Sequence, residues 1–240
     1  MNLKNVWTIT VKDFGLFRKK KSILYTAFIL PLLISIGLPI ILWYVIKDKN
    51  VPSNLFEAFS FFFVILAAII PTFIASYSFV GEKTEKTLEP LLATPTTDDE
   101  ILLGKSLAAF LPVIIMIFIS AVIFMVLMDI FTTAKVGHIY FPNWFFATII
   151  LLDSPLGCIM SIELSVIISS RVNDVRSAQQ LAVLTFIPFF ALYLLTEIRI
   201  ITLNVDTLLV IAGIIAIIDI GLFFASRAIF QREEILTKWK

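Results

Sequence analysis

Cysteine, histidine and charged residues are all scarce in this chain. Its 240 residues include one Cys and one His, and 15% of them carry a charge. The lone Cys158 excludes an intramolecular disulfide and most thiolate metal sites. The lone His138 leaves no Ser–His pair and no H-E-x-x-H motif, so we expect neither an intramembrane enzyme nor a metal centre. The net charge of +1 gives no reason to expect a nucleic-acid partner.

Long apolar runs take the place of the missing charge. Hydrophobic residues make up 59% of the sequence, and its mean hydropathy is +0.99. They fall in blocks of about 17–27 positions, and roughly 20 helical residues cross a hydrocarbon core of about 30 Å. The pattern predicts an all-α integral membrane protein with six transmembrane helices. The predicted spans are residues 22–46, 56–80, 107–131, 144–170, 179–195 and 208–230.

Lys and Arg are distributed unevenly between the two ends of these spans. An even number of spans places both chain ends on one side, and that side holds fifteen of the 19 Lys and Arg residues. The other side holds Lys47, Lys49, Lys135 and Arg199. Because basic loops stay inside, we expect both termini and residues 81–106 in the cytoplasm, with the chain in the cell membrane. The other loops are short, so residues 1–240 are expected to form one transmembrane domain without a soluble catalytic domain.

Residues 2–21, ahead of the first span, have an amphipathic pattern. Apolar residues recur there at steps of three and four, and the charged residues lie off that face. The apolar residues are Leu3, Val6, Trp7, Val11, Phe14 and Phe17, and the charged ones are Lys4, Lys12, Asp13 and Arg18. This spacing predicts a helix in the membrane interface. The alternative is a short cytoplasmic helix packed on the bundle.

The longest charged interruption of the apolar pattern is residues 81–105, which hold six acids and three lysines. Pro90 favours the first turn of a helix and Pro95 ends one, so a short helix is expected near residues 87–94. Thr97 and Glu100 form a T-x-x-E capping box, which predicts a second helix running into the third span. The alternative is a solvated connecting loop, against which its length and its exposed leucines argue.

The sequence GEKTEKTLEPLLATP, followed nine residues later by GK, has a known counterpart. It resembles the cytoplasmic signature of ABC-2 type ABC transporter permeases, and the six-span topology is similar as well. The resemblance implies that residues 87–94 are a coupling helix that docks on a separate cytoplasmic ABC ATPase subunit. The residues implied in ATPase coupling are Glu82, Glu85, Thr87, Leu88, Glu89, Leu91, Leu92 and Pro95.

The resemblance also implies an assembly. The permease subunit of an ATP-driven exporter is expected to form a dimer, with a second copy or a similar permease, in contact with membrane lipid. ATP and Mg are expected on the partner ATPase, and no cofactor on this chain. Gly104, Lys105 and Ser106 imitate the end of a phosphate-binding loop, but Asp99 stands where its first glycine belongs. We therefore expect the ATPase to be another chain.

Three acids lie well away from the ends of predicted spans, where a carboxylate costs about 2.5–3.5 kcal/mol to insert. Asp153, Glu163 and Asp219 are therefore candidates for a translocation path. The alternative is that they are protonated and hydrogen-bonded across helices. They also support a second function, a secondary transporter or ion channel that uses these carboxylates, although it leaves the charged loop without a role.

Small residues share one face of the fourth predicted span. This small-residue stripe predicts the close approach of another helix. Glu163 lies about 180° from it at about 100° per residue, so it faces a second interface or the path. Pro155, directly after Asp153 and Ser154, predicts a break or kink there. The stripe consists of Ser154, Gly157, Cys158, Ser161 and Ser165.

Overall fold

Helices make up the whole regular structure of the described chain. The computed structural model describes residues 2–19, 21–45, 53–84, 96–135, 137, 139–198 and 200–230. Every regular element in these ranges is a helix. Six of the helical segments in them are long and apolar enough to cross a bilayer. The predicted all-α membrane fold with six spans is therefore confirmed.

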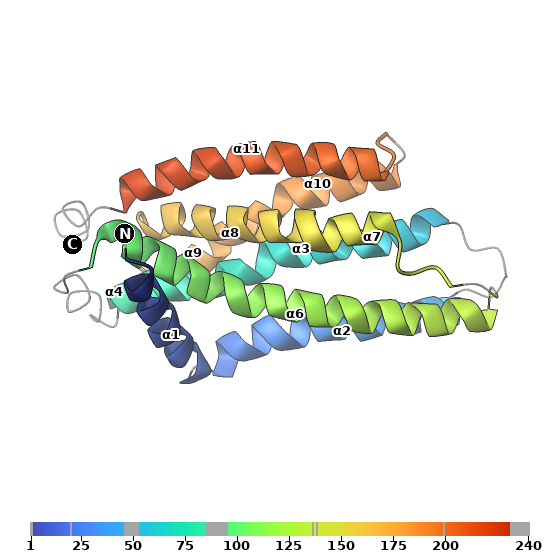
Figure 1. Cartoon of the computed structure of the whole chain (residues 1–240), viewed down its shortest axis with the longest axis horizontal. Coiled ribbons are helices and arrows are strands. Elements are labelled where there is room, and N and C mark those ends of the chain that lie inside the picture. Colours follow the sequence, from blue (N-terminus) through green and yellow to red (C-terminus); the bar gives the residue numbers. More distant parts are fainter. Residues whose placement is uncertain are drawn as a thin grey trace.

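The long helices run side by side along the longest axis of the molecule, and one short helix crosses them near one end (Figure 1). That crossing helix is α1, and it lies at the end where α6 begins and α11 ends (Figure 1). The α-helices are α1 (Leu3–Lys19), α2 (Lys21–Val45), α3 (Ser53–Ser76), α4 (Glu82–Thr84), α6 (Asp98–Lys135), α7 (Trp144–Thr148), α8 (Ser154–Ser169), α9 (Val175–Ala182), α10 (Phe186–Glu197) and α11 (Val205–Ile229). Two π-helical turns, η1 (Tyr77–Gly81) and η2 (Ile149–Asp153), and one 3-10 turn, η3 (Val183–Thr185), continue neighbouring helices.

The centre of the bundle is the contact between α3 and α8, the most extensive between any two of its helices. The small-residue stripe of α8 faces α3, and its serines are fully buried. Ser161 donates a hydrogen bond from Oγ to the backbone oxygen of Ala68 at 2.7 Å. Such a bond across helices requires the two backbones to lie close together. The close approach predicted for this face is confirmed.

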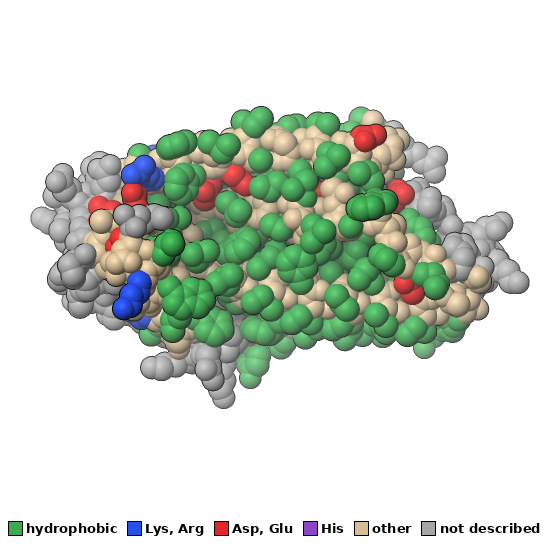
Figure 2. Space-filling view, viewed as in Figure 1, with side chains coloured by type: hydrophobic (Ala, Val, Ile, Leu, Met, Phe, Trp, Pro, Cys, Tyr) green, Lys and Arg blue, Asp and Glu red, His purple; other side chains and the backbone are tan. Residues whose placement is uncertain are grey.

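Helices α2, α10 and α11 form the outside of the bundle and expose many apolar side chains. The space-filling view shows this apolar surface as a broad band over the middle of the molecule (Figure 2). Exposed apolar residues on this scale suit a hydrocarbon solvent rather than water.

Two prolines account for departures from regular α-helix. The π-helical turn η2 directly precedes α8, whose first turn contains Pro155. The break or kink predicted at this proline takes the form of a π-helical turn, through which the helix continues. Pro188 follows the 3-10 turn η3 in the fifth span. Its ring has no N–H and clashes with the carbonyl four residues earlier, which disfavours regular α-helix there.

Candidate functional site

Helix α1 divides its apolar residues between two environments. Val6 and Phe17 are buried against the bundle, together with Ile9. Leu3, Trp7, Val11 and Phe14 are exposed on the adjoining part of the helix surface. The apolar arc is wider than a single contact, and one edge of it packs on α6. Asp13, which the sequence pattern placed off the apolar face, is buried at this edge, so that placement was wrong. The helix both packs on the bundle and keeps an apolar surface exposed.

A buried ionic cluster lies where α1 meets α6. Its centre is Lys105 of α6, whose side chain has no exposed surface. The Nζ atom of Lys105 donates to Glu82 Oε2 at 2.6 Å and to the backbone oxygen of Ser78 at 2.9 Å. It also lies 3.3 Å from Asp13 Oδ2. Lys12 completes the cluster from the surface, with its Nζ 2.9 Å from Glu82 Oε1.

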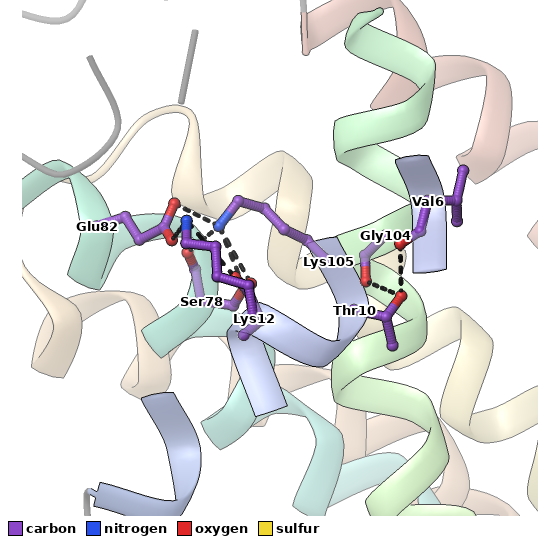
Figure 3. Close-up of polar contacts among 8 residues, drawn as sticks. Val6, Thr10, Lys12, Ser78, Glu82, Gly104 and Lys105 are labelled. Atoms are coloured by element: carbon purple, nitrogen blue, oxygen red, sulfur yellow. Dashed lines mark hydrogen bonds and ion pairs between the residues drawn. The ribbon is translucent and has the colours of Figure 1, made fainter. Parts of the chain in front are cut away.

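The cluster draws its residues from four different elements, and Figure 3 shows Lys105 extending from α6 toward Ser78 and Glu82. Asp13 comes from α1, Ser78 from η1 and Glu82 from α4. Ser78 Oγ donates to Asp13 Oδ2 at 2.7 Å, so the hydroxyl joins α1 to η1 directly. Single π-helical turns are frequent at functional sites, and this one supplies both a carbonyl and a hydroxyl to the cluster.

The charges of this ionic cluster balance. Two carboxylates, Asp13 and Glu82, face two ammonium groups, Lys12 and Lys105. Moving a single charge out of water costs several kcal/mol, and the cost is offset only where partners satisfy it closely. The buried Lys105 ammonium meets this condition with two carboxylates and a carbonyl. Removal of one member therefore leaves an uncompensated buried charge.

Gly104, next to Lys105, lies where α6 packs closely on α1. A Cβ atom at Gly104 would lie 2.8 Å from Cβ and Cγ2 of Ile9, and 3.0 Å from the backbone oxygen of Val6. The oxygen of Gly104 instead accepts a 3.0 Å hydrogen bond from Thr10 Oγ1 (Figure 3). The Gly-Lys pair that imitates a phosphate-binding loop thus serves packing and charge pairing inside this chain.

The first turn of α6 is fixed to its surroundings by further polar contacts. Thr97 Oγ1 accepts from the N–H of Glu100 at 3.3 Å, and Glu100 Oε2 accepts from the N–H of Thr97 at 3.3 Å. The predicted capping box is therefore confirmed. Glu100 also accepts from the Asn5 side chain of α1 at 3.0 Å. On the other side, Arg227 of α11 forms two 2.7 Å hydrogen bonds with Asp99.

Replacing Thr97 with alanine is expected to destabilise the protein by about 1 kcal/mol, because the start of α6 loses its side-chain cap. Thermal unfolding of the purified protein in detergent micelles measures the effect. Thr97→Ser is the matched control, since it keeps the hydroxyl and is expected to keep the stability. Equal unfolding midpoints for the two variants would contradict a capping role.

The ionic cluster joins Glu82 and Lys105, which lie on either side of residues 87–94, the predicted coupling helix. Most of the residues predicted for that role lie outside the described residues, namely Glu85, Thr87, Leu88, Glu89, Leu91, Leu92 and Pro95. Glu82 is described, and it is 5% exposed within the cluster. Any coupling role of Glu82 is therefore exercised through the cluster rather than by direct contact with a partner.

Sequence reasoning missed Asp13 and Lys105 as site residues. The available signal was Ile9, which extends the apolar arc of α1 so that Asp13 falls between apolar positions instead of outside them. A charged residue inside a buried arc requires a buried partner. Lys105, the last residue of the charged loop, was the basic residue nearest to the start of the third predicted span and so the available partner for Asp13.

The three acids inside the spans are buried in the bundle. Asp153 is fully buried, and Glu163 and Asp219 are 8% and 7% exposed. Within the described part of the chain, both carboxylate oxygens of Asp153 and Asp219 and Oε2 of Glu163 have no hydrogen-bond partner. Asp153 and Glu163 are ten residues apart, which is about 15 Å along a helix, so the three acids do not form one cluster. Asp219 is near enough for its charge to act on Glu163 and on Cys158.

Comparison with known proteins agrees with this architecture. A family model described as ABC-2 family transporter protein matches residues 7–207. No curated protein matches the chain. Subunits of this family span the membrane, do not hydrolyse ATP themselves and generally work with an ABC ATPase partner. The match covers α2 to α10 and most of α1, so the chain belongs to the ABC-2 family of transporter proteins and is a multi-pass membrane subunit of a transporter.

Proposed function

We propose that this chain is the permease subunit of an ATP-driven exporter and that residues 81–106 couple it to a separate cytoplasmic ABC ATPase. The ATPase binds ATP and Mg, and this chain holds no cofactor. Two permeases, identical or similar, form the translocation path with two ATPase subunits. Both termini are cytoplasmic, the complex lies in the cell membrane, and α1 rests its exposed apolar surface on membrane lipid.

The observation that supports this proposal most directly is the buried ionic cluster beside the coupling segment. Glu82 lies near the start of residues 81–106 and Lys105 near their end, and the two side chains meet at 2.6 Å. Asp13 joins the same cluster from α1. Close-packed, charge-paired groups move together rather than stretching apart. A displacement of the segment by an ATPase would therefore be passed to α1 and α6 at once.

The three buried acids are proposed to line the path that these movements open. Asp153, Glu163 and Asp219 lie in the bundle interior, and an ionisable group there is by default a candidate for ion or substrate handling. The same acids favour the second candidate, a secondary transporter or channel that works without an ATPase. The two functions differ in whether the coupling segment is needed.

Substitution of Glu89 and Leu91 tests the coupling role. We expect Leu91→Ala and Glu89→Ala to lower the amount of ATPase that copurifies with the permease about tenfold, as for residues central to an interface. Coupled ATP hydrolysis in liposomes should fall in parallel, while membrane insertion is unchanged. Leu209→Ala and Asp206→Asn are matched controls, because both residues are exposed on α11. Unchanged assembly and hydrolysis, or transport by liposomes that lack the ATPase, would refute the proposal.

A further inference from the structure

A cavity of about 250 Å³ lies between α6, α8 and α11. Its lining includes Leu102 and Ser106 near the start of α6 and Ser226 near the end of α11, and Ser106 directly follows Lys105 of the ionic cluster. Most of its lining is apolar, and three polar side chains interrupt it. The apolar lining includes Phe110, Ile159 and Phe223, and the polar residues are Ser106, Glu163 and Ser226.

Glu163 is the one acid that lines this cavity. Its side chain is 8% exposed, and its Oε2 atom is buried with no hydrogen-bond partner among the described residues. Desolvating a carboxylate without a partner is costly, so the group requires a proton or a cation. Its position opposite the small-residue stripe explains the orientation, because the stripe faces α3 and Glu163 faces the cavity.

Asp219 is a second buried carboxylate, on the helix that carries two of the lining residues. Asp219 precedes Phe223 and Ser226 by four and seven residues on α11, so it shares their helix face one turn deeper in the bundle. Neither of its oxygens has a hydrogen-bond partner among the described residues. Figure 2 shows acidic side chains set among hydrophobic ones in the seam between α11 and α8.

The bases next to this cavity are already paired elsewhere. Lys105, which precedes the lining residue Ser106, is held by Asp13 and Glu82. Arg227, which follows Ser226, is held by Asp99. Within the described ranges, neither of these two neighbouring bases is available to pair with Glu163.

We propose that this cavity binds a small organic ammonium ion, whose N–H groups donate to Glu163 while its apolar body contacts Phe110, Ile159 and Phe223. The carboxylate of Asp219, one turn deeper on α11, adds to the attraction without lining the cavity. Small metal cations prefer a shell of several oxygen ligands, which a mostly apolar wall does not supply. The volume is below the roughly 300–1,000 Å³ of pockets for drug-sized ligands, so a single ring on a short chain fits. The claim that the protein transports this ion rests on the proposed function. The claim that the cavity binds the ion does not.

Equilibrium binding of tritiated 2-phenylethylammonium to the permease in lipid nanodiscs, without any ATPase, tests the site. We expect Glu163→Gln to weaken binding at least tenfold and Asp219→Asn to weaken it severalfold. Asp206→Asn is the matched control, since Asp206 is exposed on the same helix as Asp219. The neutral analogue propylbenzene should displace the label at least tenfold less well than unlabelled 2-phenylethylammonium.

The ligand comparison on the unaltered protein decides the question even where Glu163→Gln fails to fold. Equal displacement by the neutral analogue, or full binding by a folded Glu163→Gln variant, would overturn the proposal. Binding of radiolabelled Na⁺ with no binding of the organic ion would show a metal-cation site and would also overturn it. Because the assay contains no ATPase, a failure here leaves the coupling role untouched, and a failure of coupling leaves this binding measurable.

Discussion

Replacing Lys105 with methionine is expected to lower the free energy of unfolding by about 3–5 kcal/mol, the cost of leaving a buried ion pair without one partner. The carboxylates of Asp13 and Glu82 remain, with 1% and 5% of their side chains exposed. Methionine is close to lysine in length and volume, so the loss reports missing charge more than a cavity. Thermal unfolding of the purified permease in detergent micelles measures it, and ATP hydrolysis by the reconstituted complex should fall with it.

A second substitution separates charge balance from simple damage. Asp13→Asn combined with Lys105→Met leaves Lys12 and Glu82 paired at 2.9 Å and restores a neutral cluster. We expect the double variant to regain at least half of the lost stability, which is the signature of coupled neighbours in a double-mutant cycle. Arg227→Met is the control for an exposed pair, expected to cost at most about 1 kcal/mol. Additive losses in the double variant would contradict the charge-balance explanation.

Local sequence patterns predicted the elements because their causes are local. Six apolar runs predicted six spans, and a Thr and a Glu three residues apart predicted the cap of α6. The serine and glycine spacing of the fourth span likewise predicted which face of α8 another helix would approach. Each of these depends on the period of one helix or on one turn of backbone.

The ionic cluster depended on contacts that no local pattern contains. Lys105 meets Glu82 across 23 residues of sequence and Asp13 across 92. Basic residues at the cytoplasmic ends of spans are expected from membrane topology alone. Lys105 stands at such a position, so nothing in the sequence indicated that its side chain would be buried. Asp13 was assigned to the polar side of α1 because the helix was considered alone, without the packing of its Ile9 edge on α6. The sequence alone identified the acids inside the spans. Only the arrangement of α6, α8 and α11 shows that one of them, Glu163, lines a cavity.

A side chain at Gly104 is expected to detach α1 from the bundle. Even the Cβ of Gly104→Ala would meet Ile9 Cβ at 2.8 Å and the Val6 carbonyl at 3.0 Å, and a main-chain carbonyl cannot rotate away. Overpacking of this kind costs about 1–3 kcal/mol, and Gly104→Val should exceed Gly104→Ala. Because Lys105 is the next residue, the displacement should also pull Asp13 away from its ammonium and weaken the ionic cluster.

Hydrogen exchange across the chain distinguishes this local detachment from general destabilisation. In Gly104→Ala the backbone amides of α1 should exchange faster, because their helix loses its support, while those of α8 keep their protection. Gly213→Ala is the matched control, since no atom lies within 4 Å of a Cβ built there. Unchanged protection of α1 in Gly104→Ala would show that the helix can shift to accept the methyl group. The α1–α6 contact would then be an adjustable surface, unsuited to passing a movement of the coupling segment into the spans.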